Sequence, residues 1–222
     1  MGNLIQPGLD PNNVSAGSGS ITGRVVHTNG EPMDKAIVYL TTDNSFPRNP
    51  ASLITTVTTG ADGFYTFSGV PMGQDYYISA SNDRCKFDGL SVSDITRVLN
   101  HLLFVNELSS PQQYIVADVN NDGDISVNDV LFVRALLLGI ISEFPAQESF
   151  AIIRSDMVFE EENPLVTEWQ QEAMLFGVMN LSGPALVPDL TAYKIGDTTF
   201  SANGCNESVS YTHLTLPTIL RV

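Results

Sequence analysis

Two twelve-residue segments of this chain follow one pattern, and this duplication constrains the fold more than any other feature. The segments span residues 83–94 and 118–129, so they start 35 residues apart. The first ends in Leu-Ser-Val-Ser-Asp and the second in Ile-Ser-Val-Asn-Asp, and an apolar run follows each of them. Because a similar ending recurs at a fixed offset, the pattern predicts two copies of one loop–helix unit rather than two unrelated surface turns.

In the second copy, oxygen-bearing side chains alternate along the loop. Asp118, Asn120 and Asp122 occupy positions 1, 3 and 5, and Asp129 occupies position 12. Gly123 at position 6 permits a sharp turn that a side chain would hinder. This order is typical of a calcium-binding loop, in which position 7 adds a backbone carbonyl and position 9 often binds through water. The predicted Ca2+ ligands of this copy are therefore Asp118, Asn120, Asp122, Asp124, Ser126 and Asp129.

The first copy has lost part of this ligand set. Cys85 and Phe87 stand at positions 3 and 5, where they offer no hard side-chain oxygen. Asp83 and Asp94 remain at positions 1 and 12, and Asp88, Ser91 and backbone carbonyls are candidate substitute ligands. We therefore expect Asp83 and Asp94 to bind calcium weakly or after a rearrangement, and the second loop to be the dominant site.

The two loops and the helices predicted after them resemble the type I dockerin repeat, an EF-hand-like calcium module with aspartate at position 12. The resemblance is carried by Asp129 and the apolar run at 130–139, and by their counterparts in the first copy. It implies a cohesin-like protein partner and a link to polysaccharide degradation. Asn128 and Arg134 stand at positions through which dockerins contact their partners, so they are the candidate partner-binding residues.

A small antiparallel β-sandwich is predicted for residues 20–81. Short β-rich runs span 20–28, 36–42, 53–58, 63–68 and 76–80, and turns rich in Gly, Pro and Asn separate them. We expect the first two runs to form a hairpin. The aromatic residues of this region offer a sugar-stacking face as one interpretation, but we favour core packing and cross-strand pairing for Phe64, Tyr65, Phe67, Tyr76 and Tyr77.

Three motifs of this region resemble the carboxypeptidase regulatory-like, or prealbumin-like, domain. They are Ile-Thr-Gly-Arg-Val at 21–25, Gly-Glu-Pro-Met-Asp-Lys-Ala-Ile-Val-Tyr-Leu at 30–40 and Thr-Gly-Ala-Asp-Gly-Phe-Tyr-Thr-Phe-Ser-Gly-Val-Pro-Met-Gly at 59–73. The resemblance implies a stalk or spacer from the structural group that includes carbohydrate-binding-like folds.

The expected organisation is multi-domain and mainly β, with a small α module. Apolar side chains three and four residues apart predict helices at 95–104 and 130–139 that pack on each other. Ser110 followed by Pro111 predicts the start of a short helix between them. The ranges are a linker at 1–19, the β-sandwich at 20–81, the dockerin-like calcium module at 82–141, a β-rich companion region at 142–208 and a tail at 209–222. The companion region resembles a segment of surface proteins from Bacteroidetes-type bacteria, and the tail resembles a translated sequencing adapter.

Composition limits the classes of partner. A formal net charge of −15 with ten Lys and Arg residues argues against nucleic acid and anionic membranes. Arg134 interrupts the most apolar run, so no membrane span is expected.

The first residues lack the features of a signal peptide, so we expect an internal segment or one that has lost its leader. Cys85 and Cys205 are too few for a disulfide framework, and a single long-range bridge between them is an alternative that we do not favour.

Catalytic motifs are absent from the sequence. It contains no His-Glu-x-x-His, Gly-x-Ser-x-Gly or phosphate-binding glycine loop, and we expect no enzyme. The main hypothesis is a non-catalytic, calcium-dependent docking module of a secreted or cell-surface protein. One alternative is a structural stalk or adhesin segment, in which calcium stiffens a joint with neighbouring β-domains of the same protein. The other alternative is polysaccharide binding by the β-sandwich.

Overall fold

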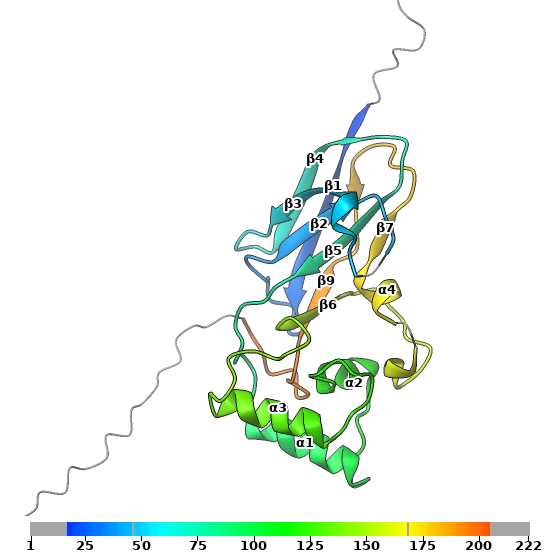
Figure 1. The fold of residues 1–222 in the computed structure, drawn as a ribbon. Helices are drawn as coiled ribbons and strands as arrows, with labels where there is room; N and C mark the ends of the chain where they lie inside the picture. Colours follow the sequence, from blue (N-terminus) through cyan, green and yellow to red (C-terminus); the bar gives the residue numbers. More distant parts are fainter. Residues whose placement is uncertain (1–16, 46, 168, 205–222) are drawn as a thin grey trace, which may run out of the picture.

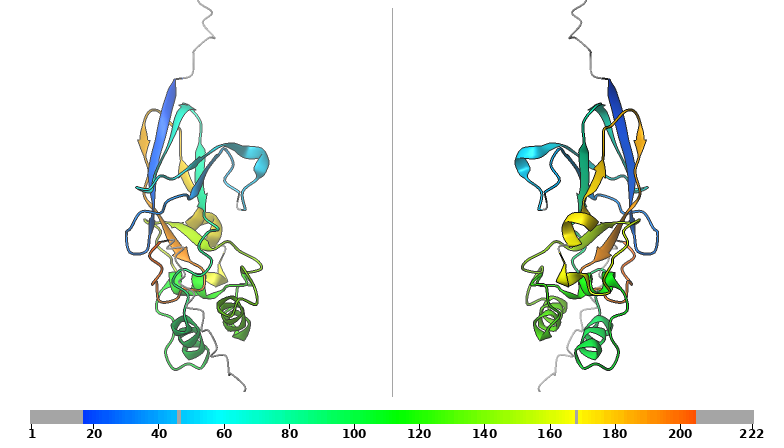
Figure 2. Two further views of the ribbon diagram at one scale, coloured as in Figure 1. Left: turned by 90° about the vertical axis from the view of Figure 1, so that its left-hand side faces the viewer. Right: turned by 90° about the vertical axis from the view of Figure 1, so that its right-hand side faces the viewer.

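The computed structural model describes residues 17–45, 47–167 and 169–204. Within these residues, two β-sheets face each other, and most of the helices gather at one end of this sandwich (Figures 1 and 2). A mainly β fold with a β-sandwich and a few helices is thus confirmed. The strands are β1 (Ser18–His27), β2 (Ile37–Thr41), β3 (Leu53–Thr58), β4 (Phe64–Pro71), β5 (Tyr76–Ser81), β6 (Phe150–Arg154), β7 (Phe176–Val178), β8 (Ala185–Leu186) and β9 (Leu190–Lys194). The helices are α1 (Val92–Leu102), α2 (Pro111–Ala117), α3 (Val127–Leu137) and α4 (Trp169–Met174), with short 3-10 turns η1 (Pro50–Ser52) and η2 (Pro164–Val166).

One sheet has the strand order β4-β1-β9-β6, with β8 beside β1, and the other has the order β3-β2-β5-β7. β1 pairs in parallel with β8 and β9, and the remaining pairings are antiparallel. Inward side chains of both sheets form one core, in which Ile21, Phe67 and Ile152 from one sheet meet Val38 and Ile78 from the other. Burial of these apolar faces against each other stabilises the two layers.

The hairpin expected between the first two strands is not formed. β1 pairs with β4, where Ile21 lies opposite Phe67, whereas β2 pairs with β3 and β5. After β1 the chain turns back only as far as an isolated bridge between Val26 and Pro32. Proline has no backbone N–H to continue a ladder, and the chain then crosses to the other sheet before β2 begins.

The strands that follow the helices belong to the same two sheets as the strands that precede them. β9 lies parallel to β1, with Val25 opposite Leu190, and β7 lies antiparallel to β5, with Tyr77 opposite Gly177. The segment expected as a companion region therefore supplies strands to the sandwich itself, and α1 to α3 are inserted between β5 and β6. Order along the chain suggests a boundary at residue 142, but it does not reveal which distant strands share a sheet.

The helices expected at 95–104 and 130–139 are formed, but each begins three residues earlier than predicted, because a capping box fixes its start. α1 begins after Ser91 and α3 after Ser126, and in both helices the serine and an aspartate three residues later form a capping box. α2 begins at Pro111 with Ser110 as its N-cap, which confirms the predicted short helix. α1 and α3 lie side by side at the end of the molecule away from most of the sandwich (Figure 1).

Two apolar clusters hold these helices in place. The first buries Val98 of α1, Tyr114 of α2 and Val130 of α3. The second buries Leu136 of α3 together with Ile153 of β6. Because the second cluster contains residues of both parts, the helical insertion and the sandwich are packed together and not merely linked.

Most aromatic residues of the sandwich are part of its core. Tyr65, Phe67 and Tyr76 are at most 2% exposed and belong to the core cluster. Phe64 is 48% exposed, and the guanidinium of Arg24 lies over its ring at 5.5 Å from the centroid. The interpretation as core residues is confirmed for the three buried rings, which cannot form a stacking face for sugars.

Cys85 is disulfide-bonded, so the disfavoured alternative of a bridge is the correct one for this residue. Cys205 lies outside the described residues, and so does the whole tail at 209–222. The expected linker lies outside them up to residue 16, and its last two residues, from Ser18, already belong to β1. Among the described helices, none combines the length and the apolar character needed to cross a bilayer.

Candidate functional site

The loop at 118–129 starts where α2 ends, with Asp118 as the C-cap residue. Asp118 is 3% exposed, and its carboxylate points back into the loop. Oδ1 accepts a hydrogen bond from the backbone N–H of Asp122 at 3.1 Å, and Oδ2 accepts one from Gly123 at 2.9 Å. Gly123 has a φ of 84°, which glycine adopts more readily than other residues. The sharp turn predicted at position 6 is therefore present, and it wraps around Asp118.

Asp129 closes the other end of this loop. Its Oδ2 accepts a hydrogen bond from the backbone N–H of Ser126 at 2.8 Å, as part of the capping box of α3. Its Oδ1 accepts hydrogen bonds from the backbone N–H groups of Val119 at 3.0 Å and Asn120 at 3.4 Å. Asp129 is 1% exposed, so this side chain fastens the start of the loop to the start of the helix from a buried position.

Asn120, Asp122 and Asp124 lie nearer to solvent. Asn120 donates from Nδ2 to Oδ2 of Asp122 at 2.6 Å, and Oδ1 of Asp122 accepts from the backbone N–H of Asp124 at 3.1 Å. Within the part of the chain that the structure describes, no three His, Cys, Asp or Glu side chains converge as a group that would hold a metal ion. The predicted ligands thus share one loop, but the side-chain oxygens of Asp118, Asp122 and Asp129 accept hydrogen bonds from N–H groups of that loop.

The two buried carboxylates of this loop have raised pKa values. Burial raises the pKa of Asp118, and the charges of Asp129 and Asp122 raise it further, against hydrogen bonds from the backbone of Gly123 and Asp122. Burial also raises the pKa of Asp129, against hydrogen bonds from Ser126 and the backbone. No described lysine or arginine forms a salt bridge with either residue. Among the described residues, these two carboxylates are therefore stabilised by hydrogen bonds and not by an ion pair.

In the first loop, Asp83 is engaged with other protein groups. Nζ of Lys86 lies 2.6 Å from its Oδ1, and Ser149 donates to the same oxygen from N at 3.1 Å and Oγ at 3.2 Å. Burial alone would raise the pKa of Asp83, but the hydrogen bond and charge of Lys86, with the bonds from Ser149, lower it overall. Asp83 therefore has a counter-ion, which weakens the reason for it to bind a metal.

Asp94, the other predicted ligand of the first loop, is completely buried. Its Oδ2 accepts hydrogen bonds from N and Oγ of Ser91, both at 2.9 Å. Its Oδ1 accepts hydrogen bonds from Oγ1 of Thr198 at 3.2 Å and from the backbone N–H of Thr199 at 3.1 Å. Burial raises the pKa of Asp94, and the charge of Asp197 adds to the rise. Asp83 and Asp94 are thus held by different partners.

Residues 197–204, which follow β9, cover the first loop. Oγ of Ser201 donates to the carbonyl of Gly89 at 2.9 Å, and Oδ2 of Asp88 accepts from the backbone N–H of Gly204 at 3.2 Å. A Cβ atom on Gly89 would come within 2.4 Å of Oδ2 of Asp197, so the two segments are in close contact. Sequence reasoning missed these residues, because the only signal at 197–199, Asp-Thr-Thr, indicates no more than a turn.

The two loops also differ in backbone conformation. In the first loop, Cys85 and Gly89 have left-handed φ values of 59° and 71°. In the second loop, the left-handed residues are Asn121, with 54°, and Gly123, with 84°. Counted from the first aspartate of each loop, these are positions 3 and 7 against positions 4 and 6. Only the second loop therefore turns at the glycine position of a calcium-binding loop.

Asn128 and Arg134 lie at exposed positions of α3, as a partner-binding role requires. Large apolar side chains are also exposed at matching positions of the two repeats. We call these six residues the repeated apolar positions: Val92 and Val127, Leu103 and Leu138, and Val105 and Ile140. Each is at least 58% exposed, so the same apolar positions reach the surface in both copies of the repeat.

Comparisons with known proteins bear on the sandwich. The family model of the carboxypeptidase regulatory-like domain matches residues 20–92, and no curated protein matches the chain. BcpA, the major pilin subunit of Bacillus cereus, aligns with a TM-score of 0.23 and 23% identity over 28% of this chain and 18% of that one. The dioxygenase domain of a dioxygenase carbohydrate-binding protein fusion from Streptomyces sp. SirexAA-E aligns with a TM-score of 0.22 and 15% identity over 35% of this chain and 63% of that one. The chain thus spans less than two thirds of either protein.

The family match covers β1 to β5, the strands that precede the helical insertion, and it ends at the first residue of α1. The three motifs that suggested the resemblance lie on these strands and their turns. The strands β6 to β9, which complete the two sheets, lie beyond the match. Residues 20–92 of this chain are therefore similar to the carboxypeptidase regulatory-like domain over the first five strands of the sandwich.

Proposed function

We propose that this chain is a non-catalytic, calcium-binding docking unit of a secreted or cell-surface protein. The observation that carries the proposal is the pair of buried carboxylates in one loop, Asp118 and Asp129, of which the charge of Asp129 raises the pKa of Asp118 and neither has a salt bridge to a described lysine or arginine. The dockerin-like repeat of loop and helix supports the same proposal. The carboxypeptidase regulatory-like domain would then serve as the support on which the docking unit is carried.

In this proposal Asp118, Asn120, Asp122 and Asp129 hold Ca2+ together with the carbonyl of Asp124, and Ser126 contributes through water. A bound cation would offset the repulsion among the carboxylates of the loop. Because Asp129 also caps α3, the free energy of binding would stabilise the start of that helix. Asp83 and Asp94 would contribute a weaker site only if Lys86 and Thr198 released them.

The proposed partner is a cohesin-like protein domain, which would attach the chain to machinery for polysaccharide degradation. The repeated apolar positions support this part of the proposal, since they offer apolar contact area outside the sandwich. Asn128 and Arg134 supply exposed polar groups on the helix that follows the calcium loop. Calcium would act indirectly, by fixing the loop and the start of α3.

Calorimetric titration of the full chain with Ca2+ tests the proposal. We expect one dominant site in the wild type and none in Asp122→Ala, whereas Glu160→Ala, which removes an exposed acid outside the loops, keeps the site. A pull-down from the secreted proteins of the host, with and without chelator, then tests docking. A retained protein that is lost both with chelator and in the Asn128→Ala, Arg134→Ala double variant supports docking, and retention unaffected by either contradicts it.

A structural stalk is the second candidate function. It is favoured by the return of β9 to β1 and by the hydrogen bonds of Asp94 to Thr198 and Thr199, which join the helical insertion to the sandwich. In a stalk, calcium would stiffen this joint, and the partners would be neighbouring β-domains of the same protein. A rise in melting temperature with calcium, combined with no calcium-dependent retention of any protein, would favour the stalk over docking.

A further inference from the structure

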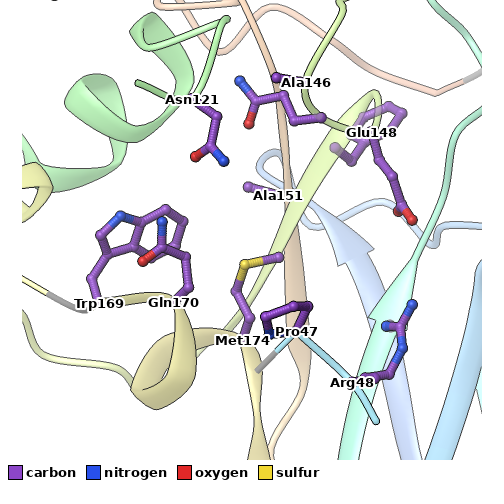
Figure 3. A pocket seen from close by; sticks show the side chains of 12 residues that line it. Pro47, Arg48, Asn121, Ala146, Glu148, Ala151, Trp169, Gln170 and Met174 are labelled. Carbon is purple, nitrogen blue, oxygen red and sulfur yellow. The ribbon is translucent and has the colours of Figure 1, made fainter. Parts of the chain in front are cut away.

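A cavity of about 620 Å³ lies where the helical insertion meets the sandwich (Figure 3). Its wall is made by the loop before η1, by residues around the start of β6, by α4 and by Asn121 of the second loop. Small-molecule sites in proteins typically have volumes of roughly 300–1,000 Å³. None of the proposed calcium ligands lines this cavity, so it is separate from the metal site.

One side of the cavity combines an aromatic ring with amide side chains. Trp169 and Gln170 come from α4, and the carboxamide of Asn121 points toward the same space (Figure 3). Trp169 is 7% exposed and is packed in the same apolar cluster as Leu136 of α3, so its position is fixed. A carboxamide carries both donor and acceptor atoms, and an indole ring offers an apolar face.

The opposite side carries one positive and one negative side chain, Arg48 and Glu148 (Figure 3). The guanidinium of Arg48 lies 3.6 Å from the centroid of the Tyr39 ring and donates to Oγ of Ser79 at 3.2 Å. Stacking and this hydrogen bond hold Arg48 in one orientation. Because this side of the cavity carries one positive and one negative side chain, it strongly favours neither an anionic nor a cationic ligand.

We infer that this cavity binds a neutral polyhydroxylated ligand, namely one unit of a sugar chain. A hydroxyl group both donates and accepts hydrogen bonds, as the amides of Asn121 and Gln170 do, and it can also bond to a guanidinium or a carboxylate. The part of Trp169 that lines the cavity adds an apolar contact for the C–H groups of a sugar. An anionic ligand would meet Glu148 and the overall charge of −15, and a cationic ligand would meet Arg48.

Trp169 is the single tryptophan of the chain, so intrinsic fluorescence of the full-length protein reports on this cavity directly. The probes are the methyl glycosides of glucose, galactose, mannose and xylose, titrated one at a time. We expect at least one of them to change the emission in a saturable way. Gln170→Ala and Asn121→Ala should each weaken that sugar roughly 2- to 10-fold, which is the value of one lost hydrogen bond. Gln112→Ala on α2, outside the cavity wall, is the matched control and should bind as the wild type does.

Saturation-transfer NMR on the sugar protons covers the case in which a sugar binds without changing the emission. The inference is overturned if none of the four glycosides gives a signal in either measurement. It is also overturned if the two cavity variants bind as tightly as Gln112→Ala does, since the sugar would then bind elsewhere. A zwitterionic probe, dialanine, that binds while the glycosides do not would assign the cavity to peptides instead. Melting curves of every variant confirm that it is folded before titration.

Discussion

The carboxylate of Asp94 accepts a hydrogen bond of 3.2 Å from the hydroxyl of Thr198, between residues 104 positions apart in the chain. Asp94 ends the first loop and caps α1, whereas Thr198 follows the last strand of the sandwich. Both residues are completely buried. The bond therefore ties the helical insertion to the sheet in a place where water cannot substitute for either partner.

Thr198→Val should lower the free energy of unfolding, because it leaves a buried carboxylate with one donor fewer. Hydrogen bonds to charged groups contribute about 1.5–3 kcal/mol, and the remaining bonds to Asp94 should limit the loss to the lower part of that range. Urea denaturation measures the change. The control is Thr58→Val, at an exposed position of β3, which should stay within about 0.5 kcal/mol of the wild type. Equal stabilities of the two variants would contradict the structural role of this bond.

Substitution of single acids should show that the two loops contribute unequally to calcium binding. Asp122→Ala should abolish the dominant calcium site, while Asp83→Ala should leave it intact, because Asp83 is paired with Lys86 and Ser149. Calorimetry of the full chain gives the number of sites, and far-ultraviolet circular dichroism shows whether calcium adds helix. Two sites of equal affinity, or a loss of binding with Asp83→Ala, would show that the first loop takes part in the main site.

Partner binding should depend on α3 and not on the exposed aromatic of the sandwich. Asn128→Ala combined with Arg134→Ala should reduce capture of a calcium-dependent partner by roughly tenfold or more, because the proposal places both among the few residues that carry most of the binding free energy. Phe64→Ala, which removes an exposed ring from β4, should leave capture unchanged. Surface plasmon resonance with the captured protein measures both. If Phe64→Ala reduces capture and the double variant does not, the partner binds to the sandwich and not to α3.

Lys194 should make stability depend on pH. It is 2% exposed, and Nζ donates to the carbonyls of Ser149 and Ile195 at 3.2 Å each. Burial lowers the pKa of Lys194 to about 7, although Asp88 and Asp197 oppose this shift. In the unfolded chain its pKa is about 10.4. Between these values the unfolded state binds more protons, so the free energy of unfolding should rise as the pH increases from about 7 toward 10.

Lys194→Met should flatten this dependence, because methionine fills a similar volume without a charge. Urea denaturation at a series of pH values from neutral to alkaline gives the slope for each protein. Lys35→Met, at an exposed position, should keep the slope of the wild type. If wild type and Lys194→Met show the same slope, other groups must control the pH dependence.

Calcium binding should alter the fluorescence of Trp169. Asn121 belongs to the second loop, and Nε2 of Gln147 donates to the carbonyl of Asp118. Both residues line the cavity together with Trp169, so ordering of the loop should change the surroundings of the ring. We expect a saturable change in emission on calcium addition to the wild type and none in Asp122→Ala. If calorimetry detects calcium binding but the emission does not change, then calcium binding at the loop does not affect the surroundings of Trp169.

Interactions within a few residues determined the parts of this protein that the sequence predicts well. The capping boxes at Ser91 and Ser126 connect residues three positions apart, and they fix where α1 and α3 begin. Alternation of apolar residues likewise marked β1 to β5. The turn at Gly123 in the second loop follows from twelve consecutive residues, so its pattern could be recognised without knowledge of the fold.

Tertiary structure alone decided which strands pair and which acids receive partners. The pairing of Val25 with Leu190, and the absence of a β1–β2 hairpin, depend on free energies summed over whole sheets, to which many strands of similar pattern could contribute. The two loops share aspartates at positions 1 and 12, yet the fold gave Asp94 the hydroxyl of Thr198 and left Asp118 beside Asp129. The donors that reach Asp94 come from a segment more than a hundred residues away, and no local pattern predicts them, since electrostatic and hydrogen-bond energies depend on distance in space and not on separation along the chain.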